Sequence, residues 1–472
     1  MKVARKIAYN VLASSASKIA STVLALVSIG FITRYLGKDG FGDYATVLAF
    51  FAFFSAISDL GLYQISTREI SREGADAEKI MGNVFTLRIV SAAAVVFVSP
   101  LVVWFLPYSS EVKMGIIVAG AAYLFSSAYQ ILNGIFQKNL SMDKVSFSEL
   151  GGKILQVLFI IAAVKFNLGF AWIIFSLLVY MTFVFFAVFF FSRRYVRVKL
   201  RFDWDYWKTF LKQSLPMGGA AVITFLYFKM DTLLLSVMKG SADVGVYNAA
   251  YKVLENITFF PAMIVGLVLP IMSLNVFSNR VEFESVANKT FKFFAIMTIP
   301  LVVGTLFLAD GIIDLIGGAG FSESAYVLRI LVFPLALIFF GHLFNAVLIV
   351  SNLQKKLMAV LGVAAFLNIG LNLIFIPKYS YVSAAYVSLA TELAVVALAA
   401  GLVVKKVKYI PRLEKKGAVV FSGLLMAAYL FAFRNLNFFF LALSSAGVYF
   451  FLLWATRAVK TSEIAGLVKK SQ

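Results

Sequence analysis

Fourteen apolar stretches run through this chain and constrain its fold more than any other feature. Each is roughly 18 to 28 residues long, and about 20 helical residues are needed to cross about 30 Å of hydrocarbon. The chain is 61% hydrophobic and only 14% charged, whereas soluble domains average about 45–50% and 25%. We therefore expect an all-α, polytopic membrane protein with fourteen transmembrane helices and no folded domain outside the membrane.

The basic residues predict the orientation of the chain. Most of the 43 lysines and arginines fall in segments on the same side as the N-terminus, and such segments face the cytoplasm. We expect a multi-pass protein of the cell membrane with cytoplasmic N- and C-termini and a first span that is not cleaved. Short basic loops beside spans also explain the net charge of +20 without nucleic acid, because they contact anionic lipid headgroups.

Two basic linkers divide the spans into groups of six, six and two. The first linker also carries Trp204, Trp207 and Phe210 among its charges, a composition typical of an amphipathic helix in the cytoplasmic interface. The predicted division is 1–192 and 214–404 for two six-helix lobes, 193–213 and 405–418 for the basic linkers, and 419–472 for the last two helices and a cytoplasmic tail.

An internal repeat supports two matching lobes. The first copy has Gly37, Gly42 and Tyr44, and the second has Gly240, Gly245 and Tyr247 at the same spacing. Six crossings separate the copies, so the lobes share one orientation and are related by an axis along the membrane normal. We expect a central cavity between them, although glycine turns could also recur independently.

Five basic residues fall inside the predicted spans, namely Lys18, Arg88, Lys153, Lys229 and Lys252. Each is costly against lipid, so we expect them to line the cavity and bind an anionic substrate. Alternatives remain open for several of them. Lys153 has Glu149 and Gln156 as neighbours on its helical face, and Arg88 could extend toward the interface. Lys229 and Asp231 point apart on an ideal helix, and Asp231 could pair with Lys252.

Acidic and amide side chains within the spans form a second set of candidates. The coupling or structural carboxylates are Asp59, Asp231, Glu255 and Glu392, and the candidate polar lining is Asn248, Asn256, Asn368 and Asn372. A buried carboxylate can exchange H⁺ or Na⁺ when its surroundings change. Gln130, Asn133 and Gln137 form another polar face. Interhelical hydrogen bonding explains these faces as well as sugar recognition does. We expect no catalytic group, no metal site and no bound cofactor, because the chain has one histidine and no cysteine.

Several short motifs resemble one known family. They are Arg34-Tyr-Leu-Gly37 leading into Phe41-Gly42-Asp-Tyr44, then Asp59-Leu-Gly-Leu62, and Asp231-Thr-Leu-Leu-Leu leading into Val244-Gly245-Val-Tyr247-Asn-Ala-Ala-Tyr251-Lys252-Val-Leu-Glu255. Their order resembles that in polysaccharide and O-antigen flippases of the multidrug/oligosaccharidyl-lipid/polysaccharide exporter superfamily. The resemblance implies alternating-access transport of a polyprenyl-diphosphate-linked oligosaccharide from the cytoplasmic to the external leaflet.

The residues and the resemblance favour the same substrate chemistry. Lysines and arginines can hold a diphosphate through charge-assisted hydrogen bonds, and membrane lipids and polysaccharide-assembly enzymes are the other expected partners. One alternative is an ion-coupled drug or small-metabolite antiporter, for which five cations are a poor match when the drug is cationic. Another is a membrane-embedded saccharide polymerase or glycosyltransferase. We do not expect the protein to be an enzyme of this kind, because such enzymes usually need a sizeable aqueous loop and the external loops here are short.

Overall fold

The computed structural model describes residues 2–459, and this part of the chain is all helical without a strand. The N-terminal helices are α1 (Lys2–Asp59), α2 (Leu62–Ile70), α3 (Ala77–Trp104), α4 (Ser110–Lys138), α5 (Met142–Lys165), α6 (Phe170–Ser192) and α7 (Trp204–Met238). They are followed by α8 (Ser241–Asn275), α9 (Arg280–Gly317), η1 (Ala319–Phe321), α10 (Ser322–Val350), α11 (Gln354–Leu402), η2 (Val403–Val407), α12 (Lys416–Ala432) and α13 (Phe438–Ala455).

Eleven of the described helices are long and apolar enough to cross a membrane. Two of them contain a break and cover two predicted spans each. α1 is interrupted at Gly37, with φ +67°, and α11 at Ser380, with φ +50°. A further apolar helix, α12, is shorter. The multi-pass helical architecture is thus confirmed, and the total of fourteen spans stays a prediction.

Polar side chains at the helix ends explain where several helices begin. Asp76, Ser109, Asp203 and Asn279 each accept a hydrogen bond from a backbone N–H in the first turn of the helix that follows. Such caps satisfy donors that have no partner within the helix. α7 begins directly at Trp204 and continues through Pro216 to Met238. The aromatic part of the first basic linker is therefore continuous with this helix.

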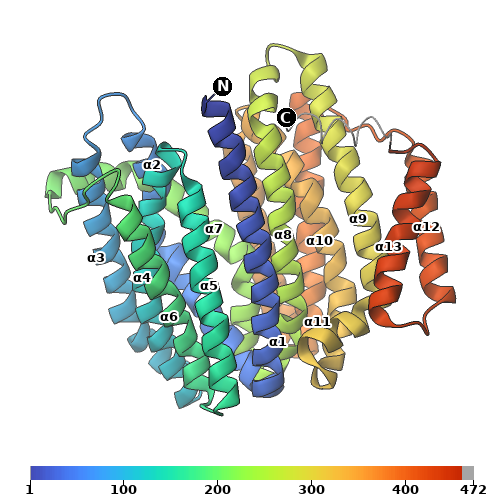
Figure 1. Cartoon of the computed structure of the whole chain (residues 1–472), viewed down its shortest axis with the longest axis horizontal. Coiled ribbons are helices and arrows are strands. Elements are labelled where there is room, and N and C mark those ends of the chain that lie inside the picture. Colours follow the sequence, from blue (N-terminus) through green and yellow to red (C-terminus); the bar gives the residue numbers. More distant parts are fainter. Residues whose placement is uncertain (1, 460–472) are drawn as a thin grey trace. The chain divides into compact units, whose positions relative to one another are not determined.

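The first compact unit contains the residues up to Asn248 together with Asn372–Ser380. α4 packs on α3 and α6, α5 packs on α1 and α6, and α7 packs on α1 and α2 (Figure 1). This unit groups α7 with the first six predicted spans. The predicted division into six, six and two was based on the repeat and the linkers, and it stays a prediction.

The second compact unit comprises Ala249–Leu371 and the chain from Tyr381 onward. α9 packs on α10 and also on the hairpin of α12 and α13 (Figure 1). The Tyr449 hydroxyl donates to the Ile296 carbonyl oxygen at 3.0 Å within a buried apolar cluster that includes Met426 and Leu430. Because this phenol is fully buried and its hydroxyl is partnered, it fixes α13 against α9.

Candidate functional site

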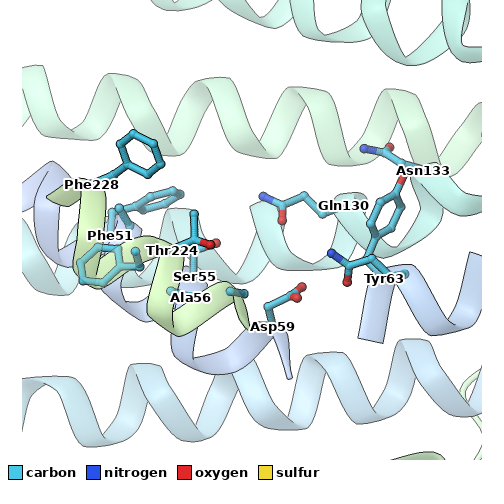
Figure 2. A pocket seen from close by; sticks show the side chains of 13 residues that line it. Phe51, Ser55, Ala56, Asp59, Tyr63, Gln130, Asn133, Thr224 and Phe228 are labelled. Carbon is cyan, nitrogen blue, oxygen red and sulfur yellow. The ribbon is translucent and has the colours of Figure 1, made fainter. Parts of the chain in front are cut away.

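A cavity of about 630 Å³ lies inside the first unit, between α1, α2, α4 and α7. Its volume is within the range of about 300–1,000 Å³ that is usual for small-molecule pockets. The polar lining residues are Ser55, Asp59, Tyr63, Gln64, Gln130, Asn133 and Thr224, and the aromatic ones are Phe51, Phe225 and Phe228. Figure 2 shows Phe51 and Phe228 at one end of the view, Asn133 and Tyr63 at the other, and Gln130 between them.

The polar end of the cavity is built mainly on α4. Gln130 Nε2 donates to Ser126 Oγ at 2.9 Å, and the Tyr63 hydroxyl donates to Gln137 Oε1 at 2.9 Å. The Asn133 Oδ1 atom is buried, and no hydrogen-bond partner reaches it from the described residues. A buried acceptor without a partner costs about 1–3 kcal/mol.

Asp59, at the end of α1, forms an ion pair with Arg88 of α3. Arg88 Nη1 lies 2.8 Å from Asp59 Oδ1 and also donates to the Ser58 carbonyl oxygen at 3.1 Å. The Arg88 side chain is 1% exposed and that of Asp59 is 18% exposed. Asp59 lines the cavity, whereas Arg88 is not among the lining residues. Arg88 therefore does not extend toward an interface. The carboxylate of Asp59 compensates the charge of Arg88 beside the cavity.

The chain breaks sharply after Asp59, at Leu60 and Gly61, which have φ +49° and +70°. This break packs against the backbone of α7. A side chain on Gly61 would overlap with the Ser214 carbonyl oxygen, and a Cβ on Gly218 would lie 2.7 Å from the Leu60 backbone. The motif Asp59-Leu-Gly-Leu62 thus brings α1 and α7 together beside the cavity.

The two copies of the internal repeat contact each other within the first unit. We call this contact, between residues 38–43 and 241–245, the glycine seam. A Cβ on Gly42 would overlap with the Ser241 carbonyl oxygen, and a Cβ on Gly245 would overlap with that of Lys38. Ser241 Oγ donates to Asp43 Oδ1 at 2.5 Å. The second glycine of each copy, Gly42 or Gly245, is therefore required for a reciprocal backbone contact.

Residues 377–380 extend the seam on the side of the second repeat. Lys239 Nζ donates to the Pro377 carbonyl oxygen at 2.9 Å, and Ser380 Oγ donates to Asp243 Oδ2 at 2.5 Å. The break of α11 at Ser380 places this hydroxyl against Asp243. All of these residues belong to the first unit.

The other predicted cations make local contacts. Lys153 Nζ donates to Gln156 Oε1 at 2.8 Å and lies 5.6 Å from the centre of the Tyr180 ring. Lys252 Nζ lies 2.7 Å from Glu255 Oε2, so one predicted cation is paired with one predicted carboxylate. Lys18 and Lys229 lie on α1 and α7. None of the five predicted cations is among the residues that line the 630 Å³ cavity. Their binding of a substrate stays a prediction.

The remaining predicted side chains are mostly buried. Asp231 accepts hydrogen bonds from the Thr232 backbone N–H at 2.9 Å and from the Tyr247 hydroxyl. Asn256 Nδ2 donates to the Lys252 carbonyl oxygen at 2.8 Å. Asn248, Asn368, Asn372 and Glu392 are all buried. Burial of these side chains is consistent with contacts between helices as well as with ligand binding. Of the four predicted carboxylates, Asp59 lines the described cavity and the others do not.

The sequence predicted three of the thirteen lining residues, namely Asp59, Gln130 and Asn133. It did not predict the hydroxyls and aromatic rings of the same cavity. One available signal was helical spacing, since Ser55 and Asp59 lie four residues apart and so do Thr224 and Phe228. In a chain with 49 phenylalanines, that spacing did not distinguish cavity rings from rings that face lipid.

The family model described as polysaccharide biosynthesis protein matches residues 7–276, more than half of the chain. The chain belongs to this family. Within the polysaccharide biosynthesis family, it is 23% identical over 278 residues to the capsular polysaccharide biosynthesis protein CapF of Staphylococcus aureus, covering 57% of this chain and 69% of that one. It is 24% identical over 213 residues to a probable low-salt glycan biosynthesis flippase of Haloferax volcanii, covering 45% of each chain.

Solved structures show that this family member has the fold of known transporters. The lipid II flippase MurJ in an inward closed conformation matches 93% of this chain and 96% of its own, with a TM-score of 0.74 and 16% identity. An inward-facing multidrug resistance MATE transporter matches 84% and 99%, with a TM-score of 0.66 and 14% identity. At these identities the likeness is one of fold alone.

Proposed function

We propose that this protein moves a polyprenyl-diphosphate-linked oligosaccharide from the cytoplasmic to the external leaflet by alternating access. The observation that carries the proposal is a polar and aromatic cavity inside a membrane-helical unit of a polysaccharide biosynthesis family member. A flippase among the relatives and another among the structural neighbours support it. The saccharide enters a protected interior while the lipid tail stays in the bilayer.

The intramembrane cations are the candidates for binding the diphosphate. A diphosphate accepts several hydrogen bonds, and those from a charged donor contribute about 1.5–3 kcal/mol each. Arg88 and Lys252 already hold carboxylates, so they would bind a phosphate only by sharing or exchanging that partner. Lys18 on α1, Lys153 on α5 and Lys229 on α7 complete the set of five. Energy for the cycle would come from Na⁺ or H⁺ bound at a buried carboxylate such as Asp231 or Glu392.

The glycine seam provides a closing contact for such a cycle. It lies after the first and seventh predicted spans, on the side that the charge pattern predicts to be external. Backbones that touch through glycine interlock few side chains, and opening the seam would break the hydrogen bond from Ser241 Oγ to Asp43 Oδ1. In our proposal the seam closes the external side while substrate enters from the cytoplasm.

Neutralising two of the lysines, Lys18→Gln together with Lys252→Gln, is expected to lower translocation about tenfold or more, because each charge-assisted hydrogen bond contributes about 1.5–3 kcal/mol. The readout is the rate at which fluorescent lipid-linked oligosaccharide crosses the bilayer of proteoliposomes. Lys113→Gln is the matched control, because Lys113 is not one of the five intramembrane cations and lies against the Trp104 ring. Equal rates in the double variant and the control would contradict the role of the cations.

The antiporter alternative predicts a different result. Cells that express such a protein would resist cationic dyes, and substitution of Asp59 by asparagine would abolish that resistance. Under our proposal, expression leaves dye sensitivity unchanged, since Asp59, the one carboxylate among the described lining residues, is already paired with Arg88.

A further inference from the structure

We propose that the cavity of the first unit, lined by Asp59, Gln130 and Asn133, binds the saccharide part of the substrate and excludes the diphosphate. This inference rests on the proposed function and adds which part of the substrate enters this cavity. It differs from the expectation drawn from the sequence, in which intramembrane cations line the interior and hold phosphate. The charges, the hydrogen-bonding groups and the aromatic rings of the cavity each support it.

The charge in the wall is unfavourable for phosphate. Among the described lining residues, Asp59 is the one aspartate or glutamate, and none is a lysine or arginine. Arg88 compensates the charge of Asp59 at 2.8 Å, but its side chain is 1% exposed whereas that of Asp59 is 18% exposed. A ligand in the cavity therefore meets the carboxylate before the guanidinium. An anion entering this space would be desolvated beside a like charge, which is costly, whereas a neutral ligand would not.

The hydrogen-bonding groups match a polyol. Each amide of Gln130 and Asn133 offers both a donor and an acceptor, and a sugar hydroxyl also does both. Both amide residues line the cavity together with the hydroxyls of Ser55, Tyr63 and Thr224. Asp59 adds a strong acceptor that Arg88 and the Gly61 backbone N–H hold in place, the latter at 3.2 Å from Oδ2. Rigid acceptors of this kind favour donors, and a diphosphate has none at neutral pH.

The aromatic end of the cavity can pack against the C–H face of a sugar ring. Phe51 and Phe228 line the cavity at the end away from Asn133 (Figure 2). The ring of Phe225 packs 5.5 Å from that of Phe53, which holds this aromatic wall in place. The negative faces of aromatic rings attract the weakly positive C–H groups of a pyranose. A lipid chain would be poorly suited to the same space because it would cover the amides without satisfying them.

The test uses the absence of cysteine from the natural chain. Ser55→Cys places one thiol in the cavity wall, and its alkylation rate in detergent reports on occupancy. The probes are lipid-linked oligosaccharide extracted from the membranes of the source organism, and undecaprenyl diphosphate without sugar. We expect the oligosaccharide lipid to slow alkylation about tenfold and the bare diphosphate lipid to leave it unchanged. Equal protection by both probes would overturn the proposal.

Variants of the wall provide a second measurement. Gln130→Leu with Asn133→Leu is expected to raise the KM for the oligosaccharide lipid about tenfold and to leave inhibition by undecaprenyl diphosphate as it is in the wild type. Asn83→Leu is the control, because Asn83 is a buried amide of α3 outside the cavity. Weaker inhibition by the bare lipid in the double variant would place the diphosphate in this cavity and overturn the assignment.

Translocation by the wild-type protein and protection of the Ser55→Cys thiol are separate results. Wild-type protein that translocates the oligosaccharide lipid, while Ser55→Cys is not protected by it, overturns the saccharide assignment alone. Wild-type protein that translocates nothing overturns the proposed function itself.

Discussion

Gly42→Ala is expected to lower the translocation rate about tenfold or more. The added methyl group would overpack the glycine seam and destabilise the state in which the seam is closed by about 1–3 kcal/mol. The added Cβ would overlap with the carbonyl oxygen of Ser241. A backbone oxygen within a helical turn cannot move aside as a flexible side chain can. The variant should fold, since the rest of α1 keeps its contacts, and it should favour states in which the glycine seam is open.

The same variant gives a conformational readout. In a Ser55→Cys background, we expect Gly42→Ala to make the thiol more reactive toward a membrane-impermeant maleimide added outside the cell. Gly240→Ala is the matched control from the other repeat, because nothing lies within 4 Å of its added Cβ. Normal translocation and unchanged labelling in Gly42→Ala would show that the seam does not open during transport.

Asp59→Asn is expected to destabilise the folded protein by about 3–5 kcal/mol, the usual cost of removing one partner of a buried ion pair. Arg88 is 1% exposed and would keep its charge without a carboxylate to balance it. Arg88→Met should cost less, because Asp59 is 18% exposed and adjoins the cavity. The double variant should recover part of the loss, since it buries neither charge alone.

Thermal unfolding of the purified variants in detergent tests this order. The expected order of midpoints places wild type highest, then the double variant, then Arg88→Met, with Asp59→Asn lowest. The partly exposed pair of Arg280 and Glu284 is a suitable reference, because ion pairs open to solvent contribute only about 0–1 kcal/mol. A midpoint for Asp59→Asn equal to that of Glu284→Gln would contradict a compensated charge in the cavity wall.

Much of the fold could be predicted from hydropathy alone, because lipid requires long apolar helices. The breaks of α1 and α11 also fall between predicted spans. Gly37 was visible as a repeat glycine, and α1 is interrupted there. The left-handed conformation of Ser380, with φ +50°, was not visible, because that position holds neither glycine nor proline. The Ser380 hydroxyl donates a hydrogen bond to Asp243, which lies 137 residues earlier in the chain.

The sequence identified individual residues of the site but did not predict which of them would lie together. Asp59 and Arg88 were both recognised as costly in lipid, but their pairing depends on packing α3 against the end of α1. The repeat predicted two similar lobes, whereas the contact between Gly42 and the turn at Ser241 shows why the spacing recurs. Helical periodicity gives the face of one helix, and it does not say which faces of different helices meet.

Translocation by the purified wild-type protein is the most direct test of the proposal that it moves lipid-linked oligosaccharide between leaflets. Proteoliposomes would carry fluorescent lipid-linked oligosaccharide from the source organism in both leaflets, and an impermeant quencher would be added outside. We predict that the protein makes the inner-leaflet share accessible to the quencher, and that a lipid with the same diphosphate and no sugar crosses more slowly. An inner-leaflet share that stays protected, as in protein-free vesicles, would contradict the account.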